Sequence, residues 1–154
     1  MSVESVKQFF SIHAPEYVVL ESESSTATVK EAAETYKVEP GQIAKTLSFR
    51  LGDECILIVV KGDARIDNKK YKNQFGTKAR MLGLEEVEAE TGHPVGGVCP
   101  FGLSKPLRIY LDISLKVYDE LIPAAGGPRA AVKISPDKIA ELTNGEWVDV
   151  CQTV

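Results

Sequence analysis

IAKTLSFRLGDECILIVVK, residues 43–61, is the stretch that predicts the centre of the fold. Residues 43–51 alternate between two sides in the manner of an extended strand, and four of the five residues on one side are apolar. Residues 54–61 are almost continuously apolar, which is typical of a strand in the middle of a sheet. Gly52 and Asp53 separate the two runs and favour a tight turn. The sequence therefore predicts a β-hairpin whose second strand is buried.

Lys45 is the one charged residue on the apolar side of the first strand. Alternation places it with Ile43, Leu47, Phe49 and Leu51. Burying an ammonium is costly unless an anion or a strong hydrogen-bonding group meets it. Two interpretations follow: either the stem of Lys45 covers apolar surface while the ammonium reaches water, or the ammonium points into a pocket that receives an anionic ligand.

The composition predicts one ordinary globular domain over residues 1–154. A length of 154 residues suits a single core, and 44% hydrophobic with 26% charged residues is usual for a globular protein. No apolar run is long enough to span a bilayer, and MSVESVKQFF lacks the basic start and apolar core of a secretory signal. We therefore expect a cytoplasmic protein with no membrane partner.

Cysteines, histidines and glycines give no sign of a metal or an organic cofactor. Cys55, Cys99 and Cys151 are widely spaced, and only His13 and His93 add imidazoles. The glycines lack the GxGxxG and GxxxxGK spacings of nucleotide-binding loops. A cysteine hydrolase built on Cys99 and His93 is a further possibility, although no orienting third group stands at a telling spacing. No metal and no cofactor are expected.

A basic segment lies between two acidic parts of the chain, whose net charge is −4. Residues 61–80 hold seven lysines and arginines against two aspartates. The basic residues are Lys61, Arg65, Lys69, Lys70, Lys72, Lys78 and Arg80. Such a run is either a solvated helix face or a patch that contacts the phosphates of a nucleic acid over a small footprint.

Outside the hairpin, short helices and strands are mixed. Helices are expected over 2–12, from Thr28 with its capping-box Glu31 to about Lys37, over 67–75, 85–90 and 115–121, and after Ser135. Further strands are expected over 17–20, 78–82, 107–113, 131–134 and 147–151. The prediction is a mixed α/β fold with hairpins beside longer crossings.

Two loops rich in glycine interrupt this pattern. In the first, residues 92–102 read GHPVGGVCPFG; in the second, residues 122–130 read IPAAGGPRA. Glycine lets a ligand approach the backbone, and Pro100 fixes the chain and removes one competing N–H. The loops are either plain tight connections or places where backbone groups bind a small polar group.

Three segments together resemble a known family. QIAKTL at 42–47, GHPVGGVCPFG at 92–102 and AAGGPRAAVKI at 124–134 have the order and separation of the YbaK/ProX family of freestanding aminoacyl-tRNA deacylases. That family is related to the editing domain inserted in bacterial prolyl-tRNA synthetases. The resemblance covers about residues 25–151.

The resemblance implies a compact mixed α/β domain with a barrel-like sheet around a pocket. It also implies hydrolysis of the ester that joins a wrong amino acid to the 3′ adenosine of a tRNA. Lys45 would be the catalytic lysine, engaging the phosphate or ribose of that adenosine. Substrate-binding positions would be Thr46, Gly96, Gly97, Val98, Cys99, Pro100, Ala125, Gly126 and Gly127. The implied partner is the 3′ CCA end and acceptor stem of an aminoacyl-tRNA, contacted by Lys61, Lys69, Lys70 and Lys72. Whether the protein acts alone or docked on a synthetase stays open.

Some positions depart from the subgroup that removes cysteine from tRNA for proline. Ala125 stands where that subgroup has serine, and Val19 and Leu20 lie nearest to its tyrosine. Pro128 and Ala130 suggest a reshaped rim. The amino acid removed therefore stays open, and so do two other functions: a non-catalytic tRNA-binding module and a hydrolase of small amino-acid esters.

Overall fold

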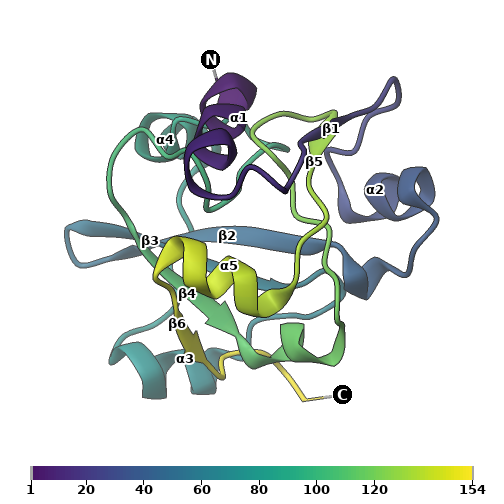
Figure 1. Ribbon diagram of the computed structural model, residues 1–154. Coiled ribbons are helices and arrows are strands. Elements are labelled where there is room, and N and C mark those ends of the chain that lie inside the picture. Colours follow the sequence, from purple (N-terminus) through teal and green to yellow (C-terminus); the bar gives the residue numbers. More distant parts are fainter. Residues whose placement is uncertain (1, 154) are drawn as a thin grey trace.

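The structure is a computed structural model that describes residues 2–153 (Figure 1). In chain order its elements are α1 (Ser2–His13), β1 (Leu20–Glu21), α2 (Val29–Tyr36), η1 (Pro40–Gln42), β2 (Ala44–Leu51), β3 (Glu54–Lys61), α3 (Asn68–Phe75), α4 (Leu84–Thr91), β4 (Arg108–Asp112), η2 (Ile113–Val117), β5 (Ala130–Ala131), α5 (Pro136–Thr143) and β6 (Glu146–Val148). The mixed α/β prediction is confirmed.

The predicted hairpin forms the first half of a four-stranded sheet. β2 and β3 pair antiparallel along their full length, from Ala44 opposite Lys61 to Leu51 opposite Glu54. β4 then runs parallel to β3, and β6 parallel to β4, giving the order β2-β3-β4-β6. β1 and β5 form a separate antiparallel pair. β2 is therefore an edge strand of the main sheet, whereas β3 is central, as its apolar run indicates.

The two faces of this sheet pack against different helices. On one face, Phe49 of β2 and Ile58 of β3 pack in a cluster with Tyr71 of α3. On the other, Leu57 of β3 packs in a larger cluster with residues of α1, α4 and α5. Figure 1 shows α3 on one side of the sheet, with α1 and α4 on the opposite side. The two faces of the sheet are thus covered by different helices.

Side-chain caps fix where several helices begin. The Thr28 hydroxyl accepts from the Glu31 N–H at 3.1 Å, confirming the capping position at the start of α2. Ser135 caps α5 in the same way, accepting from the Lys138 N–H at 3.1 Å. The helix expected over 115–121 is instead a 3₁₀ helix that begins earlier, at Ile113, where Asp112 caps it.

The strand expected over 78–82 is reduced to a single bridge between Met81 and Phe49. Two hydrogen bonds hold it: the Arg50 N–H donates to Arg80 O at 2.7 Å, and the Leu82 N–H donates to Ser48 O at 3.1 Å. Pairing stops there because Gly83 follows and α4 begins at Leu84. None of the helices within residues 2–153 has the length and apolar character needed to cross a bilayer.

Candidate functional site

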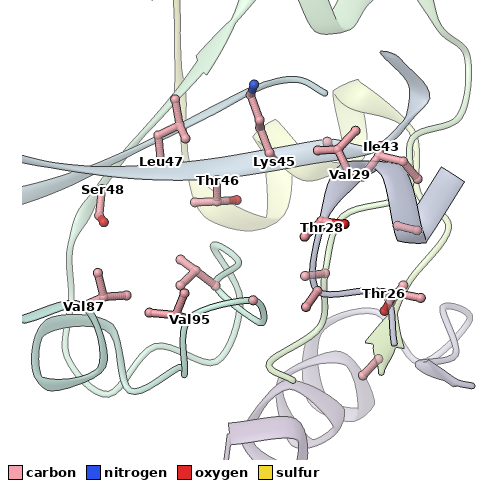
Figure 2. A pocket seen from close by; sticks show the side chains of 18 of the residues that line it. Thr26, Thr28, Val29, Ile43, Lys45, Thr46, Leu47, Ser48, Val87 and Val95 are labelled. Carbon is pink, nitrogen blue, oxygen red and sulfur yellow. The ribbon is translucent and has the colours of Figure 1, made fainter. Parts of the chain in front are cut away.

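A cavity of about 230 Å³ lies beside the free edge of β2. Its walls come from β2, the start of α2, α4, the first glycine loop and the chain around β5 (Figure 2). The lining is mostly apolar or small: Ala27, Val29, Ala32, Ile43, Ala44, Leu82, Val87, Val95, Gly96, Val98, Ile122, Ala124, Ala130 and Ala131 are among its residues. Such a lining favours a small, largely apolar group.

Alternation along β2 decides which side chains face this cavity. Thr46 and Ser48 extend toward Val87 and Val95, whereas Lys45 and Leu47 extend from the other side of the strand (Figure 2). The sequence expectation placed the pocket on the apolar side, with Lys45. The structure differs because that side is covered by the α3 layer, and the cavity opens on the side of Thr46 and along the strand edge.

Lys45 contributes to the cavity wall, but its ammonium does not point into the cavity. The ammonium donates to the Ala64 carbonyl at 2.7 Å and extends away from Val95 (Figure 2). Burial lowers the pKa of Lys45, and nearby Asp63 only partly opposes this. Within residues 2–153 no carboxylate forms an ion pair with it. Lys45 is thus a partly buried cation with spare donors.

The two glycine loops predicted separately are joined in space. The Gly126 N–H donates to Gly97 O at 3.0 Å. A Cβ on Gly97 would lie 2.4 Å from Gly127 N, so only glycine permits this approach. Gly96 has φ 93° and packs against Ala27. Gly96 lines the cavity, whereas Gly97, Gly126 and Gly127 do not.

The other expected loop positions lie at different depths. Val98 lines the cavity. Cys99 and Ala125 are fully buried in the larger core cluster, and Pro100 is buried beside Cys99. None of these three residues lines the cavity.

Cys99 and His93 are adjacent, yet they are not arranged as an activated nucleophile and its base. Cys99 Sγ lies 3.6 Å from His93 Nε2, but this nitrogen is only 2.7 Å from the Phe101 carbonyl and donates to it. The other ring nitrogen lies 2.8 Å from the Ser2 hydroxyl. Burial raises the pKa of the Cys99 thiol to about 12, so it is protonated at neutral pH.

His93 is expected to make stability depend on pH. Burial lowers its pKa, and the hydrogen bond to Phe101 offsets this only in part. The unfolded chain then takes up a proton at higher pH than the folded chain, so stability present above about pH 6.5 is lost as the pH falls. We expect His93→Gln to lessen the fall in Tm between about pH 7.5 and about pH 5, measured by circular dichroism. His13→Gln, at an exposed position, is the control; equal slopes for the wild type and both variants would contradict the prediction.

Part of the basic segment lies on α3, which packs on the face of the sheet opposite to the cavity. Lys69 and Lys72 are exposed on α3. Lys70 is already bonded, to Asp149 at 3.1 Å and to the Cys151 carbonyl at 3.0 Å, and Lys61 lies 3.4 Å from Asp63. Lys45 also extends on the α3 side of β2, so its ammonium and the lysines of α3 share one side of the sheet. Lys61 is paired with Ala44, so its side chain lies on the opposite face.

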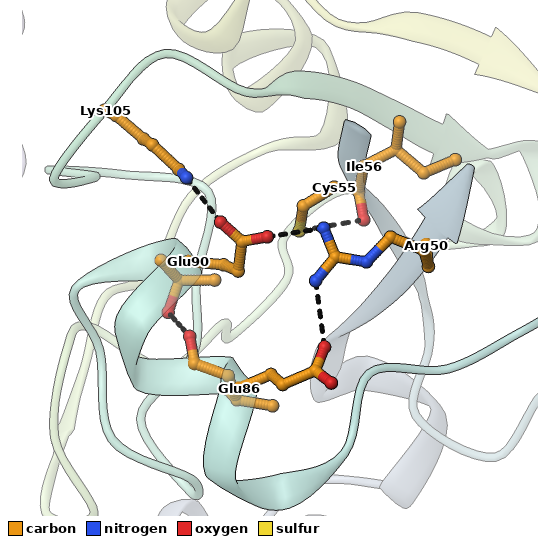
Figure 3. A network of polar contacts seen from close by, with 8 residues as sticks. Arg50, Cys55, Ile56, Glu86, Glu90 and Lys105 are labelled. Atoms are coloured by element: carbon orange, nitrogen blue, oxygen red, sulfur yellow. Dashed lines mark hydrogen bonds and ion pairs between the residues drawn. The ribbon is translucent and has the colours of Figure 1, made fainter. Parts of the chain in front are cut away.

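A network of charges holds α4, one wall of the cavity, against β2. Arg50 donates to Glu86 at 2.8 Å and to Glu90 at 2.6 Å, and Lys105 also donates to Glu90 (Figure 3). The hydrogen bond from Lys105, followed by that from Arg50, lowers the pKa of Glu90. Because Arg50 bridges two carboxylates one helical turn apart, it fixes both the position and the rotation of α4.

Sequence reasoning missed most of the apolar lining. Thr26, Val29 and Ile122 line the cavity from segments far from Lys45 in the chain. At its mouth, Met81, Leu84 and Val95 are large apolar side chains left more than half exposed. Their scattered positions gave no periodic signal.

The chain is similar in sequence to several known proteins. A family profile described as "Aminoacyl-tRNA editing domain" matches residues 23–142. The uncharacterized protein YwhH of Bacillus subtilis (strain 168) is 49% identical over 99% of this chain and 98% of its own length. EbsC of Enterococcus faecalis, provisionally named a Cys-tRNA(Pro)/Cys-tRNA(Cys) deacylase, is 32% identical over 80% of this chain and 76% of its own.

A solved structure gives the same result for the fold. A crystal structure described as that of a candidate trans-editing enzyme for prolyl-tRNA synthetase superposes with a TM-score of 0.90 at 35% identity. The superposition covers 99% of this chain and 98% of the other.

Proposed function

Because the chain belongs to the aminoacyl-tRNA editing domain family, we propose that it hydrolyses the ester of a mischarged aminoacyl-tRNA. The observation that carries the proposal is the small apolar cavity, which opens at the edge of β2 beside Lys45 and the joined glycine loops. Its volume of about 230 Å³ is below the roughly 300–1,000 Å³ of typical sites for drug-sized ligands. The cavity therefore receives the amino-acid side chain, and the nucleoside remains outside.

The reaction needs no group that the chain lacks. A water oxygen attacks the ester carbonyl carbon and forms the new C–O bond, and the bond from that carbon to the ribose oxygen breaks. The proton released from water ends on the ribose oxygen, giving a free amino acid and a tRNA with its hydroxyl restored. Backbone groups at the cavity wall, from Gly96 of the first glycine loop and from β2, orient the ester and the water, so that most of the acceleration comes from positioning.

Lys45 has the properties of a residue that meets an anion on the substrate. Its ammonium is partly desolvated, bonded to one carbonyl and without a carboxylate partner in the described chain. A phosphate or ribose oxygen of the terminal adenosine would supply the missing charge or acceptor. In this arrangement Lys45 holds the nucleotide on one side of β2 while the amino acid enters the cavity on the other.

The exposed lysines of α3 are proposed to contact the acceptor stem. Lys69 and Lys72 lie on the same side of the sheet as the Lys45 ammonium and have no ion pair within residues 2–153. Lys61 and Lys70 would add charge, although each already has an acidic neighbour. Contacts of this kind weaken as salt concentration rises.

A panel of misacylated tRNAs tests the proposed function. We expect the wild type to release free amino acid from at least one member, measured as loss of radiolabel from acid-precipitable tRNA. Cys99→Ala should keep activity within about threefold of wild type, because a buried protonated thiol is not the nucleophile. Loss of activity in a folded Cys99→Ala protein would contradict this mechanism.

Two other outcomes would point to the alternative functions. Measurable tRNA binding with every ester left intact would support a non-catalytic binding module. Hydrolysis of simple amino-acid esters that is unchanged in Lys69→Ala/Lys72→Ala, with no preference for tRNA, would support a small-ester hydrolase. Both outcomes would reject the proposed function.

A further inference from the structure

The outer edge of β2 has a gap in its hydrogen bonding. Even-numbered residues of this strand point their peptide groups away from β3, since N–H and C=O directions alternate along a strand. On this edge the Ser48 carbonyl accepts from Leu82, and the Arg50 N–H donates to Arg80. Before the strand, the Gln42 carbonyl accepts from the Ile122 N–H at 3.0 Å. Between these bonds, the outward peptide groups of Ala44 and Thr46 have no partner within residues 2–153.

The gap opens into the cavity, and a second unpaired group stands beside it. Ala44 and Thr46 both line the cavity. The Thr46 hydroxyl oxygen is buried and forms no hydrogen bond to any residue from 2 to 153. Buried polar groups are nearly always hydrogen-bonded, so a donor and acceptor left open at one point of a cavity wall marks a place where a ligand binds.

We infer that this gap binds the α-amino group and the ester carbonyl of the aminoacyl substrate, an inference that rests on the proposed function. An aminoacyl group carries an N–H donor on one side of its α-carbon and a carbonyl acceptor on the other side. A residue in a neighbouring strand presents the same pair of groups. Its ammonium donates to the Thr46 carbonyl, and its ester carbonyl accepts from the Thr46 N–H. The Thr46 hydroxyl oxygen accepts a hydrogen bond from a second N–H of the ammonium.

This pairing gives the site a chemical specificity that the apolar cavity cannot give. A free α-amino group can donate to both the Thr46 carbonyl and the hydroxyl. An N-acylated amino group has a single N–H and carries a bulky acyl group into the strand edge. The site is therefore selective for aminoacyl esters with a free amine and rejects N-acylated or peptidyl esters.

The test compares free and N-acetylated forms of the aminoacyl-tRNA that the wild type hydrolyses. We expect the wild type to prefer the free amine by at least about tenfold in kcat/KM, the scale of one or two lost hydrogen bonds. Thr46→Val should lose about tenfold on the free substrate and little on the acetylated one, whereas Thr46→Ser should retain activity. Thr77→Val, an exposed threonine away from this cavity, is the matched control. Equal rates for the two substrates, or an unchanged Thr46→Val protein, would overturn the inference.

A binding measurement separates this inference from the proposed function. The probe is 3′-aminoacylamido-adenosine, which has an amide in place of the ester, together with its N-acetyl form, titrated by NMR. Preferential binding of the free amine by wild type, weakened in Thr46→Val, supports the gap as a binding site even if no tRNA is deacylated. Equal binding of both forms by a wild type that does hydrolyse aminoacyl-tRNA would overturn this inference and would leave the proposed function standing.

Discussion

Replacing Lys45 with alanine is expected to lower kcat/KM for deacylation about a hundredfold or more, because the loss of a group that positions the substrate costs on this scale. The substitution leaves the apolar cavity and the glycine loops in place but removes the cation that would hold the terminal nucleotide. The measurement is single-turnover release of amino acid by wild type and by Lys45→Ala, with the same misacylated tRNA.

Stability distinguishes this role from a structural one. Burial lowers the pKa of Lys45, which means that the folded state disfavours its charge. We therefore expect Lys45→Met, which keeps most of the stem, to unfold at the same Tm or higher while remaining inactive. An active Lys45→Met protein, or one that loses activity only because it unfolds, would remove Lys45 from the mechanism.

The second large effect is expected at Gly97. A Cβ there would lie 2.4 Å from Gly127 N and 2.6 Å from Gly127 Cα, both backbone atoms that cannot rotate away. Gly97→Ala must therefore push the two glycine loops apart, which we expect to cost about 1–3 kcal/mol or more of unfolding free energy. Deacylation should also fall, because Gly96 and Val98 on either side line the cavity. Chemical denaturation and the deacylation assay measure the two effects.

Gly76→Ala is the matched control for that experiment. Gly76 ends α3 with φ 79°, and a Cβ there would have no atom within 4 Å. Its substitution carries only the backbone strain of a left-handed residue, about 1 kcal/mol, and lies away from the cavity. If Gly97→Ala proves no more destabilising than Gly76→Ala and stays fully active, the close contact between the loops is needed neither for stability nor for deacylation.

The hairpin could be predicted from the sequence because its signals are local. Alternation over 43–51 and the apolar run over 54–61 define β2 and β3 to within a residue. The Thr28 cap was visible for the same reason, since its partner is three residues away. The bridge at Met81 was overestimated as a strand, because its pairing depends on how far the chain follows the edge of β2 before α4 begins.

The site was only partly predictable, for a different reason. Sequence pattern and family resemblance singled out Lys45 and both glycine loops, but neither fixes on which side of β2 the cavity lies. That depends on α3 covering the face with Leu47 and Phe49, a contact between distant segments. The apolar lining and the contact of Gly97 with Gly127 also require the folded chain, since no spacing along the sequence relates them.

The position of the Lys45 ammonium and the cavity on opposite sides of an edge strand restricts the shape of any substrate. A molecule that touches both must bend around the edge of β2. A base-paired RNA terminus is too stiff for such a path, whereas an unpaired overhang can turn sharply at a single sugar. In the proposed function, such a path suits an unpaired, flexible 3′ end better than a blunt duplex end.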